Sequence, residues 1–121
     1  MELNPLEAII LRFLEAHQGK DFAISRERLV EKINEGCAPP DQTHEREIRR
    51  TIKHLTTQHG IAIGSKGGKK GGYYMCETSQ EIERVAKYYD GIGLSSLFTS
   101  SKLRKIEMRD YLGQLSLRFG A

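Results

Sequence analysis

Residues 43–55 read THEREIRRTIKHL, a stretch that combines a helical hydrophobic period with charge on one side only. At about 100° per residue, Ile48, Ile52 and Leu55 fall on one side of a helix. Thr43 is a candidate N-cap before this pattern, and Gly60 is a candidate stop after it. We therefore predict an amphipathic helix that begins after Thr43, runs to about residue 58 and buries this apolar side.

The opposite side of the predicted helix is basic and hydroxylated, and the two glutamates of the stretch fall elsewhere on the wheel. The residues on this face are Thr43, Arg46, Arg50, Lys53 and Thr57. Arginine and lysine bond to guanine O6 and N7, and threonine bonds a base edge or contacts a thymine methyl. The alternative is an ordinary solvated face, although such faces usually mix charges of both signs at i,i+4.

Two helices and a short extended stretch are predicted before this segment. Asn4 caps a first helix that closes at Gly19. Residues 22–25 form the extended stretch, and Ser25 caps a second helix that continues through Asn34.

Two strands are predicted after the basic helix. Residues 61–63 alternate apolar with small side chains, and residues 73–76 are rich in strand-forming side chains. Because adjacent strand residues point to opposite faces, we expect one of Tyr73 and Tyr74 in the core and the other exposed.

The turn between these strands is rich in glycine and lysine. Residues 65–72 read SKGGKKGG, and the lysines are Lys66, Lys69 and Lys70. Glycine lets the backbone approach phosphates closely, and lysine neutralises them. The alternative is a flexible hairpin turn that lysine makes soluble.

The last forty residues are predicted to be mostly helical. Thr78 and Glu81 form a capping box for a fourth helix. Its apolar stripe begins at Ile82 and continues through small residues, unless the segment 90–93 (Asp-Gly-Ile-Gly) breaks the helix, because glycine costs about 1 kcal/mol there.

A second apolar stripe lies near the C-terminus, at spacings of four, three and four. It consists of Met108, Leu112, Leu115 and Phe119. Such a stripe needs a partner, which is either the first helix of the same chain or a matching stripe on a second subunit. We favour a homodimer, because the stripe lies beyond the segment that completes the N-terminal core.

The predicted order is helix, strand, helix, helix, strand, glycine-lysine turn, strand, helix. On this order, with residues 43–55, Gly60-Ile-Ala-Ile and Gly72-Tyr-Tyr, the chain resembles winged helix-turn-helix DNA-binding domains of small bacterial and phage regulators. The resemblance covers about residues 5–90, and the link at residues 35–42 is longer than a strict helix-turn-helix turn. It implies a mainly α (α+β) fold with a recognition helix at residues 43–58, a two-stranded wing hairpin and a helical extension.

Composition and charge limit the class of protein and the partners that we expect. The 121 residues include 19 Lys+Arg and 16 Asp+Glu, and residues 41–76 hold seven basic and three acidic residues. A basic centre in a near-neutral chain indicates a polyanion footprint. The chain has no apolar run of membrane-spanning length, its N-terminus lacks an export signal and its two cysteines are not paired as CxxC, so we expect a cytoplasmic protein without a membrane partner.

The sequence contains no enzyme or metal-binding motif with the residues at the required spacing. Tyr73 stands where a phosphate loop needs lysine, and Ile48 stands where HExxH needs histidine. No histidine or cysteine pair has finger spacing, and His59 falls on the apolar side as a hydrogen-bonded core histidine. We expect no catalysis, no cofactor and no metal.

The sequence thus predicts a winged-helix domain over residues 1–77 and a helical extension over residues 78–121. The predicted function is sequence-specific binding of double-stranded DNA, in transcriptional regulation or a phage DNA transaction. Arg49 joins the predicted helix contacts, through bases or phosphates, alongside the outer-face residues and the turn lysines. A protein–protein adaptor and an RNA-binding protein remain as alternatives.

Overall fold

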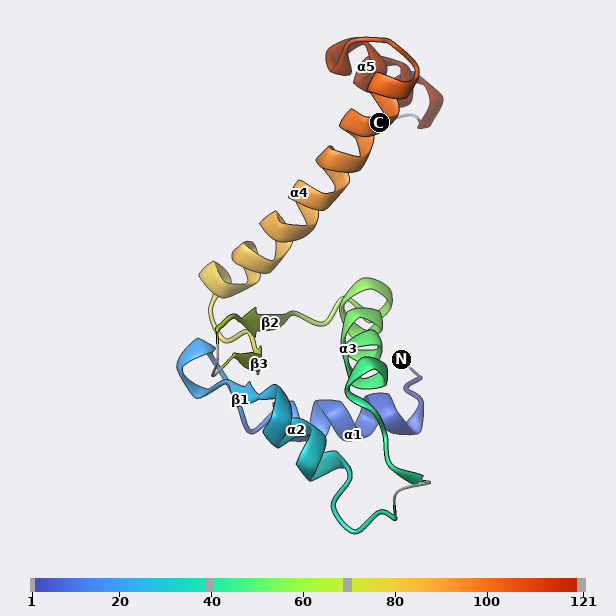
Figure 1. Cartoon of the computed structure of the whole chain (residues 1–121). Helices are drawn as coiled ribbons and strands as arrows, with labels where there is room; N and C mark the ends of the chain where they lie inside the picture. The colour runs from blue at the N-terminus through green and yellow to red at the C-terminus, as the bar shows by residue number, and fades with distance from the viewer. Residues whose placement is uncertain (1, 39–40, 69–70, 120–121) are drawn as a thin grey trace. The chain divides into compact units, whose positions relative to one another are not determined.

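The structure is a computed structural model that describes residues 2–38, 41–68 and 71–119. The chain divides into two compact units, residues 1–85 and residues 86–121. The first unit holds three helices and a small sheet, and the second holds most of one long helix and a shorter one (Figure 1). The chain is therefore α+β, as predicted, and its elements follow the predicted order.

The first two helices begin where the capping signals predict. For α1 (Pro5–Leu14), the Asn4 side chain accepts a bond from the Glu7 backbone N–H, and the Glu7 carboxylate accepts one from the Asn4 N–H, each at 2.8 Å. For α2 (Arg26–Ile33), Ser25 Oγ accepts a bond from the Arg28 N–H at 3.1 Å. These caps satisfy N–H groups that have no partner within the helix.

The third helix, α3 (Glu45–His59), starts one residue later than a Thr43 cap would give. The N-cap is His44, which makes no side-chain cap bond, so the prediction for Thr43 is wrong. Asn34 instead holds Thr43 through both backbone groups, accepting from its N–H at 2.6 Å and donating to its C=O at 2.8 Å. This clamp fixes the chain where it enters α3. Gly60 closes the helix in the left-handed conformation, as glycine at this position favours.

Three short strands form an antiparallel sheet in the order β1-β3-β2. They are β1 (Ile24–Ser25), β2 (Ile63–Lys66) and β3 (Gly72–Met75). A 3₁₀ turn, η1 (Lys20–Phe22), includes Phe22, the first residue of the predicted extended stretch, and only the last two residues of that stretch form β1.

The hairpin strands are displaced from their predicted positions. Ile63 pairs with Met75 and Lys66 pairs with Gly72, so Lys66 and Gly72 belong to strands rather than to the turn. The predicted strand at residues 61–63 is wrong for its first two residues. The N–H of Ile61 bonds to Leu55 O and thereby extends the closure of α3.

The hydrophobic core lies between α1, α2, α3 and the sheet. Its buried members are Ile10, Leu14, Ile24, Leu29, Ile48, Ile52, Leu55, Ile63 and Tyr73. The three apolar residues predicted for the inner side of α3 are all among them, which confirms the orientation of that helix about its own axis.

Tyr73 and Tyr74 are both buried, so the expectation that one is exposed is wrong. Tyr73 joins the main core. Tyr74 points to the opposite face, as strand geometry requires. Glu81 and Arg84 from the first turns of the following helix lie close enough to influence its pKa, which burial raises. Strand alternation could not predict that this second face is also covered.

The fourth helix, α4 (Ser79–Leu103), starts at the predicted capping box. Glu81 also accepts bonds from the N–H groups of Glu77 and Lys20, both at 2.8 Å, which lower the pKa of its carboxyl. The helix continues through residues 90–93 without a break. It ends just before Lys105, which has a φ of 58°, and α5 (Met108–Phe119) follows. Among the described residues, no helix is both long and apolar enough to cross a bilayer.

Candidate nucleic-acid interface

The outward face of α3 is exposed and basic. Arg46, Arg49, Arg50 and Lys53 are all solvent-exposed, and none of them forms a salt bridge with a described residue. Their charges are therefore available to an anionic partner. The packing of the opposite side of α3 into the core holds these side chains outward.

The two threonines predicted for this interface differ in their surroundings. Thr57 is exposed, and its hydroxyl donates a bond to Lys53 O at 2.9 Å. Thr43 is half-buried because Asn34 clamps its backbone. Thr43 lies at the entrance to α3 and is not part of the exposed face of the helix.

A further basic residue, Arg26, lies close to both α3 and the sheet. The helical period of residues 43–58 did not predict it. Burial raises the pKa of the Tyr73 hydroxyl, and the positive charges of Arg26 and Arg49 oppose that rise. Arg26, at the first position of α2, and Arg49 of α3 therefore both lie near this hydroxyl of β3. No pattern in the sequence joins residues 26, 49 and 73. Only the pairing of β1 with β3 brings the start of α2 to this place.

The hairpin carries one described lysine of the predicted wing. Lys66 is half-buried at the end of β2, and its partner Gly72 is buried in the central strand. Lys69 and Lys70 lie outside the described residues. Because Gly72 has no side chain, the backbone of β1 can approach it closely.

The C-terminal stripe is only partly covered in its own unit. Met108 and Leu115 are half-buried, whereas Leu112 is 38% exposed and Phe119 is 72% exposed. The buried residue of α5 is instead Tyr111, whose hydroxyl accepts a bond from Ser100 Oγ at 3.0 Å. The predicted stripe is thus not the face that α5 buries most deeply. The sequence pattern did not predict the burial of Tyr111, because its polar hydroxyl excluded it from the set of apolar side chains.

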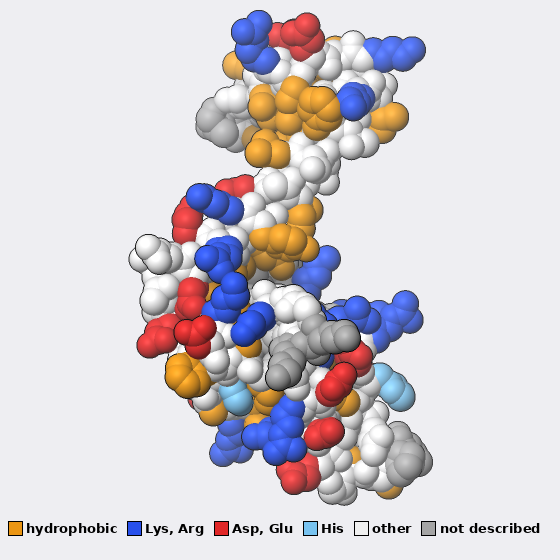
Figure 2. All heavy atoms as spheres, turned by 60° about the vertical axis from the view of Figure 1, so that its left-hand side comes forward, with side chains coloured by type: hydrophobic (Ala, Val, Ile, Leu, Met, Phe, Trp, Pro, Cys, Tyr) orange, Lys and Arg blue, Asp and Glu red, His pale blue; other side chains and the backbone are white. Residues whose placement is uncertain are grey.

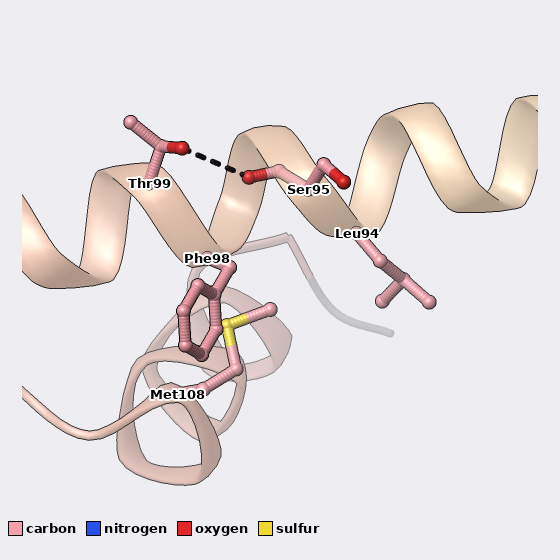
Figure 3. Close-up of a pocket in the computed structure, with 5 residues that line it drawn as sticks. All are labelled: Leu94, Ser95, Phe98, Thr99 and Met108. Atoms are coloured by element: carbon pink, nitrogen blue, oxygen red, sulfur yellow. Dashed lines mark hydrogen bonds between the residues drawn. The ribbon is translucent and has the colours of Figure 1, made fainter.

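Figure 3 shows Met108 of α5 lying against Phe98 of α4. These two residues line an open depression with a volume of about 510 Å³, together with Leu94, Ser95 and Thr99. Large apolar side chains remain uncovered on this unit (Figure 2). They include Ile92, Leu94, Phe98, Leu103, Leu112, Leu117 and Phe119.

A cluster of possible metal ligands lies where α1 contacts α3. Oε2 of Glu7 lies 3.2 Å from Nε2 of His59 and 3.7 Å from Nε2 of His54. The two imidazole rings are inclined at 76° and meet edge to face. His59 lies on the inner side of α3, as predicted, but it is half-buried and Glu7 Oε2 forms no hydrogen bond with a described residue, so the prediction of a hydrogen-bonded core histidine is not confirmed. Its partner could not be predicted, because Glu7 comes from a distant part of the sequence.

Comparisons of the chain with protein-family models, with curated proteins and with solved structures found no match.

Proposed function

We propose that this chain binds double-stranded DNA as a winged helix-turn-helix protein and performs no catalysis. The outward face of α3 enters the major groove, and the β2–β3 hairpin lies against the phosphate backbone. The observation that carries the proposal is the set of exposed cations on α3 that form no salt bridge with a described residue. The family that the sequence resembles suggests a role in transcriptional regulation or in a phage DNA transaction.

The order of the elements supports this proposal. A strand before α2 pairs with a hairpin that follows α3, and the helix that precedes the hairpin turns its basic side outward. The major groove of B-form DNA admits an α-helix, whereas the deep, narrow major groove of A-form RNA does not. An adaptor would use an apolar contact surface, and the outward face of α3 is cationic instead.

This function predicts a preference for duplex DNA. With a labelled random duplex at low salt, unlabelled duplex should compete more strongly than single-stranded DNA or RNA of equal length. The reason is that a helix in the major groove requires the duplex shape. Fluorescence anisotropy measures the competition. Stronger competition by RNA would favour the RNA-binding alternative, and no binding to any nucleic acid would favour the adaptor.

We further propose that the C-terminal unit joins two copies of the chain. Gly91 and Gly93 lie inside α4, where each costs about 1 kcal/mol relative to alanine. A Cβ at either position would meet no described atom within 4 Å, so contacts within the chain do not account for them. Together with the uncovered apolar side chains, they favour a second helix packed against this unit. A two-fold dimer would also read two half-sites about one helical turn apart.

The dimer predicts a difference between two faces of α5. At about 100° per residue, Leu112 and Phe119 share the stripe, and Leu117 lies opposite. In sedimentation equilibrium, the intact chain should dimerise, and L112E/F119E should weaken the dimer at least about tenfold, because burial of each side chain contributes roughly 1.5–3 kcal/mol.

The matched control is L117E, which changes a leucine that is 89% exposed and should leave the dimer unchanged. A monomeric wild-type chain at high protein concentration would contradict the proposal. Equal weakening by the two variants would show that the stripe is not the interface.

A further inference from the structure

Glu7 is an unusual residue for the interior of a small domain. Its side chain is only 4% exposed. Oε1 accepts the capping bond from the Asn4 N–H, but Oε2 is buried and accepts no hydrogen bond from the described residues. A buried carboxylate oxygen without such a partner destabilises the fold unless a charge or a ligand compensates.

Two imidazoles approach this oxygen from α3. One donor atom from each of Glu7, His54 and His59 lies within 4.8 Å of the other two. We propose that these three residues bind one divalent transition-metal ion, with Zn²⁺ as the best match to the ligand chemistry. Two imidazole nitrogens and one carboxylate oxygen form a ligand set that suits this ion, and water would complete the coordination.

The two distances from Glu7 Oε2 are compatible with a tetrahedral site. Zn²⁺ lies about 2.0–2.2 Å from nitrogen and oxygen ligands, which places neighbouring ligands about 3.4 Å apart. The separations from Glu7 Oε2 are 3.2 Å and 3.7 Å. His54 has a 54% exposed side chain, so it is free to make the small rotation that closes the site, and the ion can enter from solvent. The Asn4 N–H bond to Oε1 orients the carboxylate.

The ion would connect α1 to α3. It would neutralise the buried carboxylate and hold the end of α3 against the first helix, at a place distinct from the cations on its outward face. The metal site does not depend on DNA binding, and each can fail without the other.

The test uses the intact protein after chelator treatment, with Zn²⁺ titrated against a chromophoric competitor. Wild type should bind one equivalent and unfold at a higher temperature with Zn²⁺ than without it. E7Q, H54N and H59N should each lose more than the roughly 10–100-fold in affinity that removal of an outer-shell group costs. The matched control is H44N, because His44 is an exposed histidine on the same segment and lies outside the cluster.

Circular dichroism of each variant without metal separates loss of the site from loss of the fold. If a variant fails to fold, Co²⁺ added to the wild type gives a second readout, because its visible absorption should show nitrogen and oxygen ligands without sulfur. No stoichiometric uptake by wild type would overturn the proposal and leave the cluster as a histidine–carboxylate ion pair. Sulfur ligation, full retention in folded E7Q, H54N and H59N, or equal loss in H44N, would place the ion elsewhere.

Discussion

Replacing Arg50 and Lys53 together with alanine should weaken binding to a preferred duplex at least roughly 30-fold. Each side chain contributes about 1–3 kcal/mol if it contacts a base, and both are exposed on the same face of α3. The loss should be larger on the preferred site than on random duplex, because base contacts carry the sequence preference. Anisotropy titrations on the two duplexes measure both effects.

Two controls separate base reading from charge. R12A/R109A removes the same charge from exposed positions on α1 and α5, and it should change affinity far less. R50K keeps the charge but cannot form the bidentate hydrogen bonds that arginine makes to guanine. It should therefore retain its affinity for random duplex and lose its preference for the specific site. If R50A/K53A weakens all duplexes equally, α3 contacts phosphates only. If R12A/R109A is equally damaging, net charge accounts for the binding.

The second large effect concerns the hairpin. Gly72→Ala should lower the free energy of unfolding by roughly 3 kcal/mol or more, since overpacking against rigid backbone costs at least as much as overpacking in a core. A Cβ on Gly72 would overlap the carbonyl oxygen of Ile24 and lie 2.6 Å from its carbon and 2.8 Å from Ser25 Cα. These are backbone atoms of β1, so the strand must move away from β3.

The matched control is Gly67→Ala, in the same hairpin. A Cβ there would meet no atom of a described residue within 4 Å, and the change in unfolding free energy should stay within about 0.5 kcal/mol. Urea unfolding followed by circular dichroism measures both variants. Equal stability of the two would contradict the pairing of β1 with β3 and the placement of Arg26 beside the hairpin.

Local signals predicted where α1 and α2 begin, but α1 ends at Leu14 and not at Gly19 as predicted. The cap residues Asn4 and Ser25 and the apolar residues of α3 act within one or two turns, so the printed sequence contains the whole signal. The exposed cations on α3 followed directly from that helical period. The predictions were wrong where contacts between residues distant in the sequence decide the local structure. Asn34 displaces the cap at Thr43, and the pairing with Met75 shifts β2 along the sequence.

The remaining surprises depend on tertiary contacts with no sequence period. The second tyrosine of β3 is buried, with its ring against Gly64 of β2, and Arg26 lies near the interface only through the sheet. His54 and His59 are five residues apart, about 140° around a helix, which no metal motif uses. Their convergence on Glu7 appears only when α1 packs against α3.

The most direct test of DNA binding is the affinity of the intact chain for random duplex DNA over a salt series. The exposed cations of α3 and the lysines of the hairpin would displace counterions from phosphates. The logarithm of the association constant should therefore fall linearly with the logarithm of salt concentration, by about 0.9 per phosphate contact. A slope corresponding to several contacts would agree with the account. Affinity that is indifferent to salt, or no binding at low salt, would contradict it.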